Sequence, residues 1–229
     1  MSNYDQLVRA TQQAQLYLLS APIIEDVAQG HASKAMYQSF LVNAFHHVRH
    51  TVPLMMAAGA RLDPARTTLV CGFKDYIEEE FGHECWILQD LFATGADTQA
   101  IEISAPNHET ELMVAYVRDY ISHVHPLGFL GMVHVLEGTS TNLATATADL
   151  VQQSLGLPDE AFSYLRSHGD LDIEHVDFFK QLLELLDESE MGHVIHVATR
   201  VYRLYGDVLR SVARRENAVA VDAGEKNAA

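Results

Sequence analysis

The segment at residues 168–175 places two imidazoles and a carboxylate in an otherwise apolar helical stretch. An α-helix turns by about 100° per residue, so Asp172 and His175 both fall within about 40° of His168 on one helix face. This ligand set suits iron, manganese or zinc. The alternative is a solvated polar patch on a surface helix, and Gly169 weakens the helix next to His168.

Glu137 is a second candidate ligand, because it is a single carboxylate within a strongly apolar helical stretch. No lysine or arginine occurs between Arg118 and Arg166, so no cationic partner is near in sequence. A buried carboxylate has to be protonated, paired with a distant group or bound to a metal. We expect a metal-bound carboxylate here, and a core role for His134, three residues earlier.

A third candidate lies in the glutamate run 78–80 and the histidine that follows it. Glu79 and His83 are spaced i, i+4 and Glu80 and His83 are spaced i, i+3, so either carboxylate can share a helix face with the imidazole. The apolar residues on both sides predict partial burial, which makes a glutamate costly unless it is paired or metal-bound. The spacing does not choose between the two glutamates, and a solvated face is the alternative.

A cluster of cationic and imidazole side chains precedes these segments, at His46, His47, Arg49 and His50. Such groups can be metal ligands, neighbours of ligands or an anion clamp for a substrate carboxylate. They can equally be ordinary hydrogen-bonding groups between helices. We select Arg49 and His47 as candidate substrate-binding residues and leave the other roles open.

The elements that position these side chains are long helices. Apolar periodicity predicts helices at about 4–19, 33–60, 63–94, 109–123, 127–154, 159–186 and 189–215. Pro53 is expected to kink the second helix, Asp159 to cap the helix that carries 168–175, and residues 95–107 to form a loop. The candidate ligands then come from three helices, which is how helical bundles build two-metal carboxylate sites.

Composition favours one compact all-α domain over residues 1–215, followed by a disordered tail at 216–229. The 31 acidic and 15 basic residues give a formal charge of −16, which argues against nucleic-acid and anionic-membrane partners. No signal peptide or membrane-spanning stretch is visible. Cys71 and Cys85 lack a C-x-x-C pairing, so we expect a soluble cytoplasmic protein with reduced thiols.

Three motifs together resemble the haem-oxygenase-like di-iron oxidases, within the wider thiaminase II and pyrroloquinoline-quinone synthase superfamily. They are Glu-Phe-Gly-His at 80–83, Glu137 before Gly-Thr-Ser, and His-x3-Asp-x2-His at 168–175. The resemblance covers residues 10 to 205 and implies a single-domain, haem-oxygenase-like seven-helix bundle. It assigns six residues as catalytic iron ligands: Glu80, His83, Glu137, His168, Asp172 and His175.

The resemblance also implies an iron-dependent oxidoreductase. Two Fe(II) ions and O2 would form a peroxo-di-iron(III) intermediate that oxidises a small substrate of amino-acid, amine or fatty-acid type. It does not choose the substrate, the reaction outcome or iron over manganese, and it leaves room for an external electron donor and a homodimer. The alternatives are a metal-free thiaminase II-like hydrolase, for which neither cysteine lies in a matching motif, and a small-molecule binding or regulatory protein.

Overall fold

In a computed structural model, residues 1–226 are described, without the side chains of 142, 168–175 and 213–226. The described residues form helices and no strand, which confirms the predicted all-α fold. In chain order the helices are α1 (Asn3–Leu19), α2 (Pro22–Ala28), α3 (Lys34–Val48), α4 (Thr51–Gly59), α5 (Thr67–Glu80), α6 (His83–Ala93), α7 (Thr98–Glu102), α8 (His108–His123), η1 (Pro126–Gly128), α9 (Phe129–Leu155), η2 (Asp159–Ala161), α10 (Ser163–Leu183) and α11 (Glu188–Lys226).

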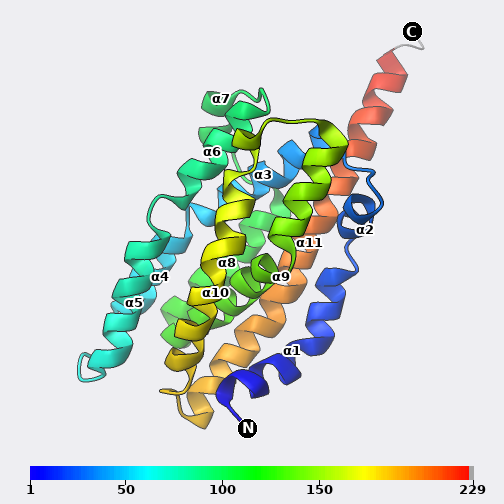
Figure 1. Cartoon of the computed structure of the whole chain (residues 1–229). Coiled ribbons are helices and arrows are strands. Elements are labelled where there is room, and N and C mark those ends of the chain that lie inside the picture. The colour runs from blue at the N-terminus through cyan, green and yellow to red at the C-terminus, as the bar shows by residue number, and fades with distance from the viewer. Residues whose placement is uncertain (227–229) are drawn as a thin grey trace.

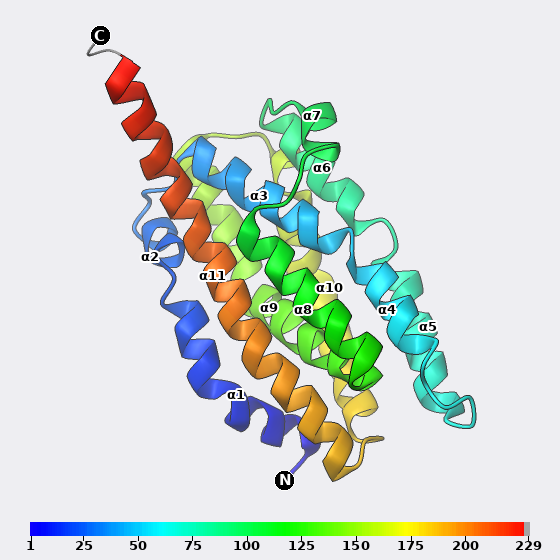
Figure 2. The same cartoon turned by 180° about the vertical axis from the view of Figure 1, so that it is seen from behind.

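Helix α11 lies between α1 and α8 and packs against α1, α8 and α9, while α10 packs against α9 and α6 (Figures 1 and 2). Buried residues recur along α11 every three or four positions, from Met191 through Val194, Val201 and Tyr205 to Val212. This spacing forms one apolar stripe, so α11 buries one face along most of the bundle. The other long helices assemble around that stripe.

Gly131 fixes how closely α9 approaches α11. A Cβ atom at this position would lie 2.5 Å from the carbonyl oxygen of Val194 and 2.7 Å from the amide nitrogen of Ala198. Only a residue without a side chain allows two backbones to approach in this way. Glu137 lies less than two turns further along the same helix, so this contact also sets its position.

The predicted helix 63–94 is interrupted at Phe81 and Gly82. Phe81 is extended and Gly82 has a φ of +92°, a left-handed conformation that glycine adopts without a steric penalty. Glu80 therefore ends α5, and His83 begins α6. The single helix expected from the sequence was wrong at this point because apolar periodicity continues across the break.

The predicted helix 33–60 is interrupted at Arg49 and His50, and Pro53 lies in the first turn of α4. A proline ring clashes with the carbonyl group four residues earlier, here that of Arg49, and provides no N–H for it. The expected kink is therefore present, one turn before the proline. Within the predicted loop 95–107, Asp97 caps the short helix α7 by accepting a hydrogen bond from the Ala100 amide at 3.1 Å.

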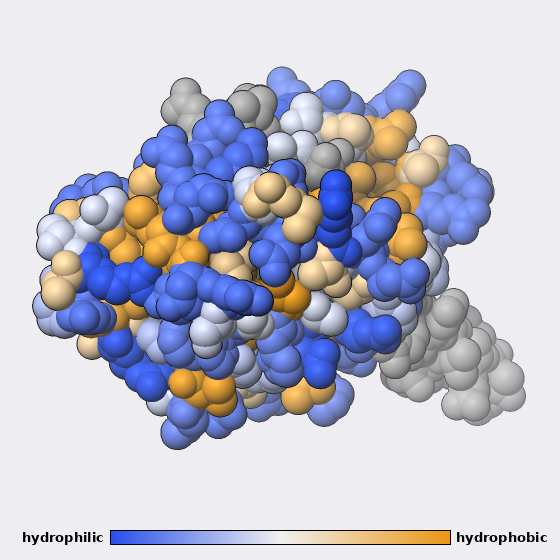
Figure 3. All heavy atoms as spheres, turned by 90° about the horizontal axis from the view of Figure 1, so that it is seen from below, coloured by the Kyte–Doolittle hydropathy of each residue, from blue (hydrophilic) through white to orange (hydrophobic). Residues whose placement is uncertain are grey.

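The backbone of α11 is helical to Lys226, past the position where the tail was expected to begin. Its side chains from residue 213 onward lie outside the described part, so the tail and the domain boundary stay predictions. None of the described helices combines the length and the apolar character needed to cross a membrane. On the face seen from below, hydrophilic residues predominate and hydrophobic ones form separate patches (Figure 3).

Candidate functional site

A small cavity of about 40 Å³ lies between α3, α4, α5, α9, α10 and α11, and we call it the carboxylate cavity. Its carboxylate and imidazole lining residues are Glu80 from α5, Glu137 from α9 and His47 from α3. The remaining lining is mostly apolar or aromatic: Val48, Thr51, Met55, Phe129, Met132, Val133, Leu136, Ser140, Tyr164 and Tyr205. Two carboxylates from different helices therefore meet in a largely apolar space.

Glu80 and His83 form the pair that the sequence predicted, across the break between α5 and α6. The Nδ1 atom of His83 lies 3.2 Å from Oε2 of Glu80, and both side chains are buried. The imidazole also stacks on Trp86, with ring centroids 4.2 Å apart. Glu79 is exposed and does not line the carboxylate cavity, so the geometry favours Glu80 as the inward-facing carboxylate.

Tyr76 on α5 contacts Glu137 on α9. The sequence analysis did not identify Tyr76 as part of the site. Its hydroxyl donates a hydrogen bond to Oε2 of Glu137 at 3.3 Å. Burial raises the pKa of Tyr76 well above its ordinary value, and the negative charge of Glu137 adds to the effect. Tyr76 therefore stays a donor. Its spacing of i, i+4 to Glu80 on α5 was the available signal, because such residues share a helix face.

The electrostatics of the carboxylate cavity favour a bound cation. Its described lining residues include no lysine or arginine. Two carboxylates in a water-poor space repel each other strongly unless a positive charge lies between or beside them. Carboxylate oxygens and imidazole nitrogens are donors that suit a divalent metal such as iron, so the residues present fit this group.

Helix α10, which carries the predicted third ligand segment, also contributes one residue to the carboxylate cavity. Tyr164 lines the carboxylate cavity from the first turn of α10. The backbone of α10 continues as helix through Gly169, so His168, Asp172 and His175 occupy register positions within about 80° of Tyr164 on the helix. Their side chains lie outside the described residues, so their roles as ligands stay predictions.

The described side chains alone do not complete a metal site. Among them, no group of three or more histidine, cysteine, aspartate or glutamate residues is arranged to hold a metal ion. The predicted centre therefore depends on residues 168–175 in addition to Glu80, His83 and Glu137.

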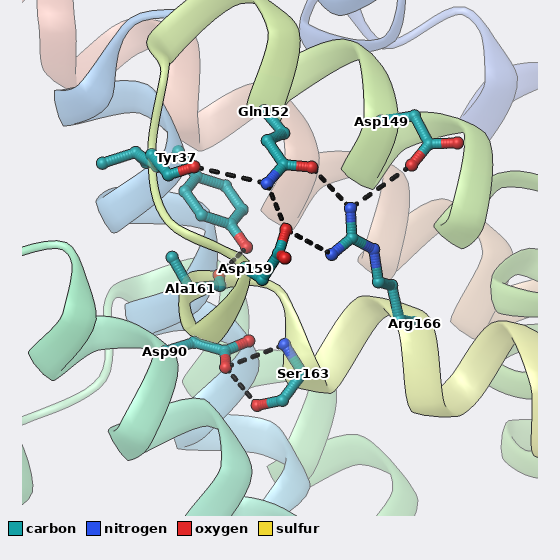
Figure 4. A network of polar contacts seen from close by, with 9 residues as sticks. Tyr37, Asp90, Asp149, Gln152, Asp159, Ala161, Ser163 and Arg166 are labelled. Carbon is teal, nitrogen blue, oxygen red and sulfur yellow. Dashed lines mark hydrogen bonds and ion pairs between the residues drawn. The ribbon is translucent and has the colours of Figure 1, made fainter.

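The start of α10 is held by a buried carboxylate from α6 (Figure 4). Asp90 is fully buried; its Oδ1 accepts hydrogen bonds from the amide and the hydroxyl of Ser163, and its Oδ2 accepts one from the Tyr164 amide at 2.9 Å. Burial raises the pKa of Asp90, and these hydrogen bonds oppose that shift. The expected capping by Asp159 was wrong, because that residue lies in η2 and its side chain instead contacts Gln152 and Arg166.

The remaining histidines of the sequence cluster serve different purposes. The Nε2 atom of His46 lies 2.9 Å from the Ser104 hydroxyl, and Nδ1 of His50 lies 3.4 Å from Arg118, so both connect helices or loops. His47 lines the carboxylate cavity and meets the Tyr205 ring edge-on, with centroids 5.6 Å apart. Among these three histidines, His47 is the one placed to contact a substrate.

Arg49 and His134 lie outside the carboxylate cavity. Arg49 is exposed, with its guanidinium 5.1 Å from the centroid of the Phe45 ring, and it donates a hydrogen bond to the carbonyl of Glu102. The structure therefore does not bring Arg49 to this cavity. His134 packs in the core beside Tyr202, and burial lowers its pKa to about 4, as expected for a neutral core histidine.

This chain is similar in sequence to one known family and in fold to several solved structures. A sequence model of a family described as iron-containing redox enzymes matches residues 38–206. A domain of unknown function with a heme oxygenase-like fold from Shewanella denitrificans OS217 is 20% identical, with a TM-score of 0.85 over 95% of this chain and 94% of that one. A search of curated proteins found no match.

Two further solved structures share the fold at lower identity. A TenA homolog from Pseudomonas syringae pv. tomato DC3000 is 10% identical, with a TM-score of 0.77 over 92% of each chain. Heme oxygenase-2 from Synechocystis sp. PCC 6803, solved with heme and NO, is 13% identical, with a TM-score of 0.75 over 96% of this chain and 88% of that one. These similarities confirm the haem-oxygenase-like all-α fold.

Proposed function

Because this chain belongs to the family of iron-containing redox enzymes, we propose that it is a non-haem di-iron enzyme that uses O2 to oxidise a small organic substrate. The observation that carries the proposal is the convergence of Glu80 and Glu137, from α5 and α9, on one largely apolar cavity. His83 lies against the first carboxylate and Tyr76 against the second. Carboxylates shared between helices are the usual ligands of di-iron centres in bundles.

The same side chains argue against haem as the iron group. Haem iron is held by histidine, cysteine, methionine or tyrosine, whereas the wall of this cavity has two carboxylates, Glu80 and Glu137, which suit non-haem iron. The carboxylate cavity of about 40 Å³ also has no room for a macrocycle. We therefore expect two non-haem ions, held by Glu80, His83, Glu137 and the α10 residues His168, Asp172 and His175.

Bound iron would supply the electrons that reduce O2. The protein side chains bind and orient the substrate, and they exclude water from the cavity. The Tyr76 hydroxyl holds one oxygen of Glu137, while Met132 and Phe129 on α9 keep the cavity largely apolar. His47 faces the same space from α3, where its imidazole can exchange a proton with a bound molecule. A small-molecule substrate, an external electron donor and a homodimer remain part of this proposal.

Iron loading of the protein tests the proposal. We expect the native chain, loaded anaerobically with Fe(II) and desalted, to retain two iron ions and to show a transient visible absorption on exposure to O2. Glu137→Gln should lose most of this iron, whereas Glu111→Gln, an exposed change on α8, should keep it. Absence of iron retention in the native chain, or equal retention in Glu137→Gln, contradicts the proposal.

The hydrolase alternative finds no support in the position of the thiols. A thiaminase-type reaction needs a nucleophilic cysteine at the cavity, and both Cys71 and Cys85 are exposed. Neither of them lines the carboxylate cavity. Replacement of both cysteines by serine should therefore leave the activity of the iron-loaded enzyme unchanged.

A further inference from the structure

A second, larger cavity adjoins the carboxylate cavity, and we call it the apolar chamber. It has a volume of about 200 Å³ and lies between α2, α3, α9, α10 and α11. Apolar side chains make most of its wall, among them Val27, Met36, Leu143, Ala144, Val151 and Leu209. An apolar protein cavity of about 150 Å³ stays dry and binds benzene, so this chamber is large enough for a hydrocarbon group.

Three of the polar groups on the chamber wall donate hydrogen bonds to the protein backbone. Tyr37 donates its hydroxyl hydrogen to the carbonyl of Ala161 at 2.7 Å. The hydroxyls of Thr139 and Ser140 donate to carbonyls one turn earlier on α9, at 2.5 and 3.0 Å. The described residues that line the chamber include no charged side chain. A charged group would therefore lose its hydration on entering without a compensating ion pair, which is strongly unfavourable.

The two cavities meet at three shared lining residues, Ser140, Tyr164 and Tyr205. On one side of these residues the carboxylates of Glu80 and Glu137 face the carboxylate cavity. On the other side the chamber extends to the apolar side chains of α2. The two cavities therefore adjoin, and an elongated molecule that passes between these three side chains would have one end beside the carboxylates and the other end in the chamber.

We propose that the apolar chamber holds the hydrocarbon tail of the substrate, so that the enzyme acts on amphiphilic molecules with a polar group at one end only. This inference rests on the proposed function and names the substrate class for the same site. The chamber selects against substrates that are charged at both ends, such as free diamines, dicarboxylates or basic amino acids. It also sets which part of the tail lies nearest the carboxylate cavity.

Equilibrium binding to the metal-free protein tests this inference separately from iron chemistry. The probes are straight-chain alcohols from hexanol to tetradecanol, measured by titration calorimetry. The expected affinity rises about fourfold per added methylene until the chamber is filled, and then levels off. The α,ω-diols of the same lengths should bind at least tenfold more weakly, because the second hydroxyl would lose hydration among side chains that are mostly apolar.

A matched pair of substitutions on α9 locates the binding site. Ala144→Leu adds a side chain to the chamber wall, whereas Thr145→Leu adds the same side chain at the neighbouring exposed position outside the chamber. We expect Ala144→Leu to weaken binding of the long alcohols at least tenfold and to shift the preference to shorter ones. Thr145→Leu should bind all of them as the native chain does.

The unfolding temperature of each variant shows whether a loss of binding is due to a filled chamber or to misfolding. Because the new side chain enters an existing cavity, Ala144→Leu should unfold at the same temperature as the native chain or higher. If this variant does not fold, Val27→Phe fills the chamber from the α2 side instead. Equal binding of diols and alcohols, or undiminished binding in a folded, chamber-filled variant, overturns the inference. Failure of iron loading would overturn the proposed function and leave the binding result as it stands.

Discussion

The hydroxyl of Tyr76 donates a hydrogen bond across 3.3 Å to Oε2 of Glu137 and so joins α5 to α9 at the carboxylate cavity. Glu80 lies one turn after Tyr76 on α5. The helix that provides one carboxylate therefore also orients the other. Groups that hold metal ligands in this way affect metal affinity strongly even though they do not touch the metal.

Replacement of Tyr76 by phenylalanine tests this relationship. The change removes one hydrogen bond and keeps the ring that packs against Phe178. We expect Tyr76→Phe to bind Fe(II) about tenfold more weakly, as measured by anaerobic titration. Tyr202→Phe removes a hydroxyl that lies beside His134 instead, and should bind iron normally. Unchanged iron affinity in Tyr76→Phe would show that Glu137 does not depend on this hydrogen bond.

Two neighbouring glutamates provide a sharp test of which one is the ligand. Glu80 is buried and lines the carboxylate cavity, whereas Glu79 is exposed. Glu80→Gln keeps the size of the side chain and removes its charge, so we expect the iron content per chain to fall by half or more. Glu79→Gln should retain the native content. The reverse pattern, measured by metal analysis after desalting, would assign the site to Glu79.

The cap that Asp90 places on α10 predicts an effect on stability. Asp90→Ala leaves the amides of Ser163 and Tyr164 buried without their acceptor. We expect a loss of about 2 to 3 kcal/mol in the free energy of unfolding, measured with urea. Asp159→Ala removes only exposed contacts with Gln152 and Arg166 and should cost less than about 1 kcal/mol. Comparable losses in the two variants would contradict the capping role of Asp90.

His134 predicts how stability depends on pH. Burial lowers its pKa from 6.5 to about 4, so between these values the unfolded chain binds a proton that the folded protein does not. The stability due to the neutral imidazole is therefore complete above pH 6.5 and is lost as the pH falls toward 4. The loss amounts to about 3 kcal/mol at the lower end of this window.

The comparison of His134→Gln with the native chain measures that contribution. Between about pH 7 and about pH 4.5 the native free energy of unfolding should fall by about 2 to 3 kcal/mol more than that of the variant. His123→Gln, at an exposed position on α8, should behave as the native chain does. Parallel pH profiles for the native chain and His134→Gln would mean that this imidazole titrates normally in the fold.

Most of the helical framework was predictable because its apolar residues follow one period over long stretches. The periodicity placed α9 within 127–154 and the start of α11 at 189, close to Phe129–Leu155 and Glu188. The breaks before α4 and after α5 were harder to locate. Pro53 acts on a carbonyl one turn earlier, and Gly82 changes the chain direction without altering the apolar pattern.

The sequence predicted which types of side chain make the candidate site, but it identified only some of the residues. An isolated carboxylate in apolar surroundings pointed to Glu137, and a glutamate run flanked by apolar residues pointed to Glu79 or Glu80, because buried carboxylates require a compensating group. The helical period alone could not separate Glu80 from Glu79, since both can reach the face of His83. Asp90 and Tyr76 were missed because their partners, Ser163 and Glu137, are distant in sequence and meet them only after the helices pack.

Gly131 limits how far the position of the candidate site can change, because it sets the distance between α9 and α11. A single added methyl group at this position would meet the backbone of α11 and push α9 outward, carrying Glu137 away from Glu80. A residue that touches neither cavity therefore limits how far the sequence can change without moving the site. Anyone who transplants the two carboxylates into another helical scaffold would have to transplant this glycine crossing with them.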